Sequence, residues 1–208
     1  MLELLGQTRW RLFAPLLLTG LTVTGIFAVG IAHGVLAASF LVSNRPYKSS
    51  ARLSISHGVA QYAMVDVTWS GKRVPVIVGS ARNVESYGVC QSWVFSLGPF
   101  GKFTLKLTAG QGSSPVRSSN AVTDAAFITV GKSIQYDVDS NIAAGAVTKG
   151  KIDPGDSNSP YFDPGSSAHQ VATLVQRDIR TIVVASSADY SELPDAKYTV
   201  TRNGSECF

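Results

Sequence analysis

The sequence predicts an all-β domain, either a sandwich or a rolled stack of antiparallel strands, preceded by one N-terminal transmembrane helix. The first observation behind this is a run of 30 residues, from Leu12 to Leu41, without Lys, Arg, Asp or Glu. The second is the pattern after Ser39, where short runs rich in Val, Ile, Thr, Phe and Tyr alternate with Gly, Pro, Asn, Asp and Ser. The third is that only 15% of the 208 residues are charged. Average proteins carry about 25%, so a charged disordered chain or a nucleic-acid-wrapping protein is not expected.

The first expected element is a membrane helix. A bilayer requires about 20 apolar residues, and residues 12–32 reach that length. Arg9, Trp10 and Arg11 precede this segment, which is typical of a cytoplasmic flank. Because the apolar stretch exceeds the roughly 7–15 residues of a secretory signal, we expect an uncleaved anchor over residues 1–38 and an extracytoplasmic domain over 39–208. The small residues before Ser39 leave a second interpretation open, in which cleavage near Ala38 releases a secreted domain.

Within this helix, Gly30 and Gly34 form a small-xxx-small pair that could let a second membrane helix approach closely. The partner would be another copy of the chain or a polytopic membrane protein. The alternative is that these residues only reflect the frequency of glycine in membrane spans.

The rest of the chain is expected to form about eleven short strands. Phe103 to Thr108 alternates apolar and polar residues, which is typical of a strand with one buried face. Pro75 interrupts an apolar run and indicates an edge or a strand start. Residues 149–167 are rich in Gly, Pro and Asp and are expected to be an irregular loop. The expected strands are 52–56, 59–69, 73–81, 84–96, 102–109, 115–123, 126–138, 142–148, 169–176, 178–186 and 196–202.

The two cysteines, Cys90 and Cys207, are expected to form a disulfide bond, because cysteines of one extracytoplasmic domain usually pair. The bond would hold a C-terminus that would otherwise fray. The alternative is a buried free Cys90 and a reactive Cys207.

Charge is unevenly distributed along the domain. Residues 45–117 contain nine basic and two acidic residues, whereas residues 118–208 contain seven basic and eleven acidic residues. A basic surface beside an anchor could contact anionic lipid or wall polymers, and opposed charges could drive self-association. The alternative is a set of solvated strand faces. The basic residues concerned are Arg45, Lys48, Arg52, Lys72, Arg73, Arg82, Lys102 and Lys106.

No catalytic residue is predicted. The sequence contains no G-x-S-x-G nucleophile elbow. Gly155-Asp156-Ser157 resembles the start of another hydrolase motif, but it lies in a polar loop, so a triad with His169 and Asp178 is disfavoured.

No metal ligands or cofactors are predicted either. Oxygen ligands for calcium gather in one loop, but their spacing does not fit an EF-hand. His57 and His169 are too few and too far apart for a zinc pattern. The loop residues are Asp153, Asp156, Asn158 and Asp163.

Several stretches along nearly the whole chain resemble an actinobacterial family of secreted or anchored envelope proteins of unknown function, whose members are sometimes labelled cholesterol esterase. The stretches are Arg9-Trp10-Arg11, Val35 to Phe40, Val89-Cys90-Gln91-Ser92, Leu107 to Gly110, Pro115 to Asn120 and Glu206-Cys207-Phe208.

The sequence therefore predicts a non-enzymatic, membrane-anchored envelope protein that acts as a scaffold or binding module through assembly. A lipid carrier with an internal apolar cavity is the alternative. A secreted lipid-ester hydrolase is disfavoured, and no nucleic-acid partner is expected.

Overall fold

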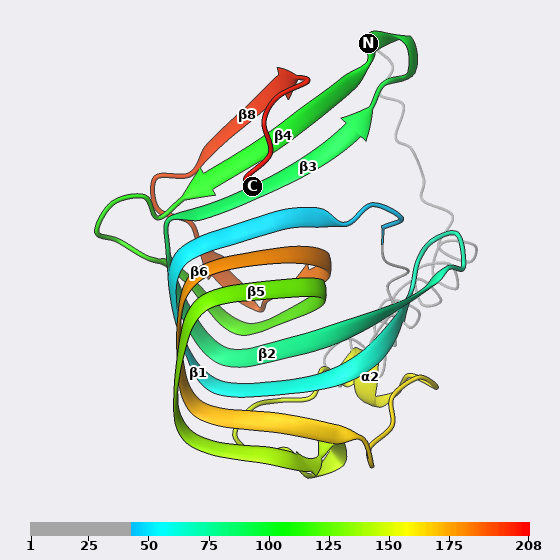
Figure 1. Cartoon of the computed structure of the whole chain (residues 1–208), viewed down its shortest axis with the longest axis vertical. Helices are drawn as coiled ribbons and strands as arrows, with labels where there is room; N and C mark the ends of the chain where they lie inside the picture. Colours follow the sequence, from blue (N-terminus) through cyan, green and yellow to red (C-terminus); the bar gives the residue numbers. More distant parts are fainter. Residues whose placement is uncertain (1–42) are drawn as a thin grey trace, which may run out of the picture. The chain divides into compact units, whose positions relative to one another are not determined.

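The computed structural model describes residues 43–208, and the predicted all-β class is confirmed for this part of the chain (Figure 1). The predicted membrane helix with Gly30 and Gly34 lies outside the described residues. Between residues 43 and 208 there is no helix long and apolar enough to cross a bilayer. The strands are β1 (Tyr47–Val67), β2 (Arg73–Tyr87), β3 (Val89–Ser96), β4 (Lys102–Ala109), β5 (Val116–Ala143), β6 (Ser167–Ser187), β7 (Tyr190–Glu192) and β8 (Lys197–Arg202). The short helices are η1 (Gly98–Phe100), η2 (Ala144–Ala146) and α2 (Pro154–Ser157).

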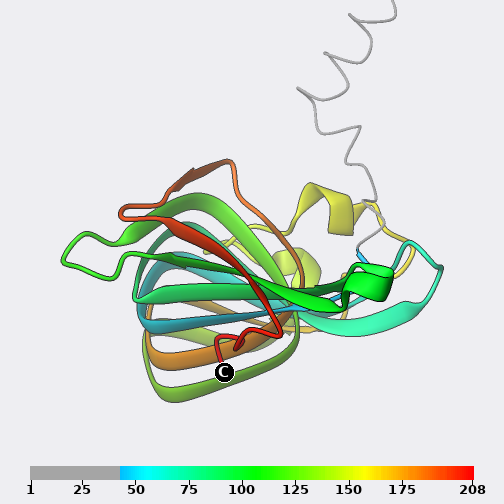
Figure 2. The same cartoon turned by 90° about the horizontal axis from the view of Figure 1, so that it is seen from above.

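Four long strands roll into a closed ring of pairings. β1 pairs with β2, β2 with β5, β5 with β6, and β6 with β1 again, all antiparallel. β3, β4 and β8 extend this sheet from the start of β1 and are called the wing below. Figures 1 and 2 show the long strands curving around one interior, with the wing continuing to one side. Of the two predicted arrangements, the rolled one is observed, as one continuous sheet.

Several predicted strand breaks lie inside longer strands, so those expected strand ends were wrong. His57 pairs with Asn83 and Val59 with Ala81, which leaves Gly58 unpaired between them. The register is the same on both sides of Gly58, so this residue, with a φ of 62°, interrupts the pairing without ending the strand. Asn120 in β5 and Asp178 in β6 adopt the same conformation.

Two other predicted strands are corrected at turns. The expected strand 142–148 is wrong, because the chain leaves the sheet after Ala143 and forms η2. The expected strand 84–96 is divided at Gly88, whose φ is 64° and where a Cβ atom would lie 3.1 Å from Cβ of Arg52. Position 88 therefore requires glycine, and the chain changes strand there.

The principal core lies between the sheet and the segment that links β5 to β6, residues 144–166, called the cover segment below. Tyr62, Val78 and Val184 are buried in this core, and Ile152 and Phe162 of the cover segment pack against them. The rings of Tyr62 and Phe162 meet edge to face, with their centroids 5.8 Å apart.

Backbone contacts hold the start of the cover segment on β1 and β2. Arg82 Nε donates to the Lys149 carbonyl at 2.9 Å, and the Ser80 hydroxyl donates to the Lys151 carbonyl. Between them, Gly150 lies so close to the backbone of Ala60 that a Cβ atom would not fit. The cover segment is therefore an integral part of the domain.

Candidate functional site

The rolled sheet lines a partly open cavity of about 530 Å³, within the range of small-molecule sites. Side chains of β1, β2, β5 and β6 form most of its wall, and the rest comes from the wing and from residues 188–193. Alternation along a strand separates this cavity from the principal core. In β6, for example, Val183 lines the cavity, whereas the neighbouring Val184 belongs to the core.

Opposite walls of the cavity differ in polarity. β1 contributes mainly hydroxyl and amide groups and β5 mainly aliphatic groups, whereas β2, between them, contributes both kinds. β1 and β5 do not pair with each other but lie on either side of β2 and β6 in the ring. The polar group of β1 comprises Ser49, Ser50, Ser54, Ser56 and Gln61, and the aliphatic group comprises Ile77, Ala81 and Val84 of β2 with Val116, Ala121, Val122 and Ile128 of β5.

The polar wall is buried and partly satisfied within the protein. Ser54 is 8% exposed and accepts a hydrogen bond from the Ser86 hydroxyl at 3.1 Å. Tyr47, the single aromatic lining residue, shares a 2.7 Å hydrogen bond with Ser186. No charged side chain from the described part of the chain lines the cavity. Since a buried charge requires a partner of opposite sign, the wall fits a neutral molecule with one polar and one apolar side.

Four acidic residues and a tyrosine gather where the cover segment meets the sheet. The Tyr62 hydroxyl donates to Oδ2 of Asp156 at 2.6 Å and accepts from the backbone N–H of Asp153. Burial first, and then the charge of Asp156, raises the pKa of Asp66 to about 6. Burial and the neighbouring carboxylates, Asp66 foremost, raise the pKa of Asp124 to about 8. One carboxyl oxygen of Asp66 and one of Asp124 are buried without a hydrogen-bond partner, which is consistent with neutral carboxyl groups.

The structure does not bring the disfavoured triad together. Ser157 hydrogen-bonds to the Pro154 carbonyl within α2. His169 instead faces Ser140 at 2.9 Å through Nδ1 and Gln135 at 3.1 Å through Nε2. Because Ser140 and His169 are cross-strand partners, their contact follows from the register of β5 and β6.

Three of the four loop residues considered as calcium ligands form hydrogen bonds with nearby backbone groups instead. Asp153 accepts from the N–H of Gly155 at 2.6 Å, and Asp163 accepts from the N–H of Gly165 at 2.9 Å. Asn158 donates to the Pro154 carbonyl. Across residues 43–208, no three His, Cys, Asp or Glu side chains are placed to hold a metal ion.

The basic residues singled out from the sequence serve several different contacts. Lys48 forms a 3.2 Å ion pair with Glu206 and donates to the Phe208 carbonyl at 2.8 Å. Lys106 reaches the Glu206 carbonyl at 3.5 Å, and Arg82 holds the cover segment. Arg45, Lys72, Arg73 and Lys102 lie at or beside turns and are exposed.

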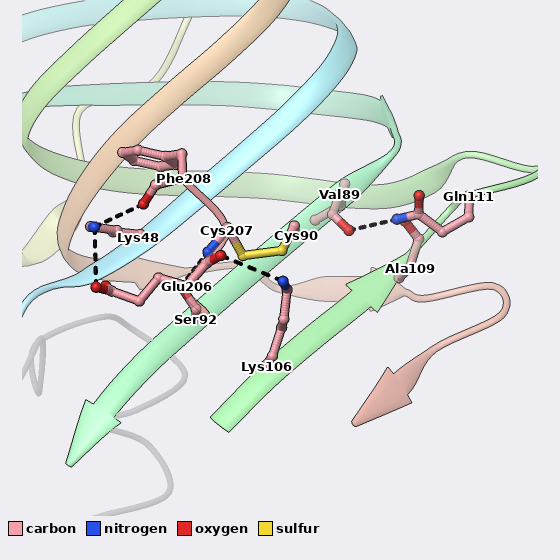
Figure 3. Close-up of a disulfide and its surroundings, with 10 residues drawn as sticks. All are labelled: Lys48, Val89, Cys90, Ser92, Lys106, Ala109, Gln111, Glu206, Cys207 and Phe208. Atoms are coloured by element: carbon pink, nitrogen blue, oxygen red, sulfur yellow. Dashed lines mark hydrogen bonds and ion pairs between the residues drawn. A yellow bond between two sulfur atoms is a disulfide. The ribbon is translucent and has the colours of Figure 1, made fainter. Parts of the chain in front are cut away.

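The predicted disulfide between Cys90 and Cys207 is confirmed (Figure 3). It fastens the C-terminal residues to the wing, where the N–H of Cys207 also donates to the buried Ser92 hydroxyl at 3.1 Å. No cysteine of the described chain is free.

Sequence reasoning missed the cavity lining. The available signal was serine at alternate positions of an expected strand, as at Ser54 and Ser56, since small buried hydroxyl groups leave room inside a sheet. Which strands face one another could not be read from this pattern.

Comparison with known proteins identifies the family. A family model described as "Family of unknown function (DUF6230)" matches residues 43–208. No curated protein and no solved structure matches the chain. The matched region coincides with the rolled domain, wing and cover segment described above. This chain therefore belongs to the DUF6230 family of unknown function.

Proposed function

We propose that this chain is a non-enzymatic binding protein of the cell envelope that carries a neutral amphipathic molecule inside its rolled sheet. The observation that carries the proposal is the cavity of about 530 Å³, with hydroxyl and amide groups on β1 opposite mainly aliphatic groups on β5. An acyl chain or ring system with a neutral hydroxylated end has this distribution of polarity. Molecules of this kind are abundant in membranes, which supports placing the domain beside one.

The localisation proposed here depends on the N-terminal sequence. Residues 12–41 contain no Lys, Arg, Asp or Glu, so we propose that they anchor the chain in the cell membrane with the domain outside. The Cys90–Cys207 disulfide supports an extracytoplasmic domain, because disulfides persist in oxidising compartments.

Filling the cavity tests the carrier function. Gly79 of β2 lines the cavity, and a Cβ atom there would have no neighbour closer than 3.9 Å. Gly79→Ile therefore projects an aliphatic side chain into empty space and favours the strand conformation. We expect detergent-extracted wild-type protein to retain a neutral amphiphile in native mass spectrometry, and Gly79→Ile to lose most of that mass while remaining folded.

Thr129→Ile is the matched control, since it adds an isoleucine to an exposed position of β5 outside the cavity. It should retain the ligand. Wild-type protein without a bound mass, or equal retention by both variants, would reject the carrier function.

Assembly through a sheet edge is a second candidate function. β5 pairs with β2 only as far as Ala125, so the rest of the strand has β6 on one side alone. This part exposes Phe127, Tyr136 and Val138, which are 51%, 58% and 41% exposed. Such an edge can pair with another strand. The same mass measurement separates the two functions, because a scaffold would appear as an oligomer without ligand and a carrier as a ligand-bound monomer.

A further inference from the structure

Two turns of the domain carry the two most exposed large apolar side chains of the described residues, Trp69 and Phe100. Trp69, in the turn between β1 and β2, is 74% exposed. Leu97 and Phe100, around η1 between β3 and β4, are 50% and 71% exposed. Both views show these two turns on the same side of the domain as the first described residues, with the turn around η1 at the top of Figure 1 and the β1–β2 turn about half-way down (Figures 1 and 2). Turns from distant parts of the sequence thus lie on one side of the domain.

Asn44, near the start of the domain, is hydrogen-bonded to the turn between β1 and β2. Asn44 Oδ1 accepts hydrogen bonds from the Ser70 backbone N–H at 3.1 Å and from its hydroxyl at 2.9 Å. The run without Lys, Arg, Asp or Glu that begins at Leu12 ends at Asn44 itself. The turn with Trp69 is therefore hydrogen-bonded to the last residue of that run.

All charged residues within the two turns are basic, although Arg73 contacts Tyr161 of the cover segment, which contains Asp153, Asp156 and Asp163. Neither residues 68–73 nor residues 97–102 contain Asp or Glu. Lys72 and Lys102 belong to these turns and are exposed. Arg45 is next to Asn44, and Arg202 of β8 pairs with Phe103 beside the second turn. Tryptophan beside exposed basic residues is typical of protein at the membrane interface.

We propose that this side of the domain, defined by Trp69, Leu97 and Phe100 with Arg45, Lys72 and Lys102, rests on the surface of an anionic lipid bilayer. The apolar side chains enter the interfacial region, and the basic side chains contact lipid headgroups. The proposal goes beyond the carrier function and does not depend on the cavity. A bilayer fits better than a protein partner because the apolar groups stand on two separate turns and the preceding segment has the composition of a membrane span.

Quenching of tryptophan fluorescence by brominated lipid tests the contact. The chain contains three tryptophans, at positions 10, 69 and 93. The full chain is placed in vesicles of phosphatidylglycerol with phosphatidylcholine that is either plain or brominated on its acyl chains. We expect the brominated lipid to quench the wild type strongly and Trp69→Phe at least twofold less. Trp93→Phe is the control, because Trp93 is half-buried and stacks on Tyr47 at 4.8 Å. It should leave the quenching of Trp69 intact.

A charge exchange tests the headgroup contact. Lys72→Glu should reduce the quenching of Trp69 in these vesicles, whereas Lys197→Glu, at the opposite end of β8 from Arg202, should not. Equal quenching of Trp69→Phe and Trp93→Phe would overturn the proposal. Equal effects of the two lysine variants would overturn its electrostatic part.

Discussion

Removing the Cys90–Cys207 disulfide is expected to lower the free energy of unfolding by about 4–5 kcal/mol. The bond joins residues 117 positions apart, and the chain-entropy model assigns this value to a loop of that length. Denaturant unfolding of the oxidised wild type and of Cys90→Ala/Cys207→Ala, both followed by far-UV circular dichroism, would measure the difference.

Contacts around the disulfide hold the C-terminal residues on β1 and β3, so this part of the fold should respond first when the bond is removed. The C-terminal residues reach β1 through Lys48 and β3 through Ser92, and Phe208 lies under the Lys48 ammonium at 5.3 Å from the ring centroid. Lys48→Met is the matched control. It removes a partly exposed ion pair and one hydrogen bond while keeping the disulfide, so it should cost about 1 kcal/mol. An unfolding midpoint unchanged by the double variant would contradict the expected role of the bond.

Stability is expected to fall by a few kcal/mol as the pH rises from about 4 to about 8, because of the acidic residues beneath the cover segment. The pKa of Asp124 is about 8 and that of Asp66 about 6, both raised chiefly by burial. Between the ordinary carboxyl pKa of about 3.9 and these values, the folded state holds protons that the unfolded state has released. Rising pH therefore favours unfolding, which is opposite to the usual effect of an ion-paired aspartate.

Asp124→Asn should remove much of this pH dependence, since the amide keeps the neutral shape that the buried carboxyl adopts. The groups that face Asp124 are Asp66, Asp153, Asp156 and Tyr47. The expected result is a variant more stable than the wild type at pH 9 and similar at pH 4. Asp195→Asn, at an exposed turn position with a φ of 53°, should leave the profile unchanged. A wild-type stability that stays constant or rises over this range would contradict neutral carboxyl groups at these positions.

The sequence by itself determined the features that depend on neighbouring residues, and those for which the chain allows few possible pairings. Alternation such as that of Phe103 to Thr108 identifies a strand locally, and the all-β class follows from many such runs. The disulfide could be predicted because two cysteines allow a single pairing within the chain. The lack of a hydrolase elbow around Ser157 was also visible in the sequence alone.

Strand lengths depended on the tertiary structure. Gly58 and Asp178 lay at or beside breaks between expected strands, but their neighbours stay paired in the same register on both sides, so each lies within a longer strand. A residue with positive φ permits either outcome, and the pairing partner decides between them.

The cavity and the acidic cluster could be found only in the folded chain. Both combine side chains that are far apart in sequence, such as Ser54 with Ser86, or Asp66 with Asp156. Which face of a strand looks inward changes at every bulge, because side chains alternate with a period of two. The local pattern therefore determines which side chains of each strand can be buried. Only the closed ring of β1, β2, β5 and β6 determines which of them surround the cavity.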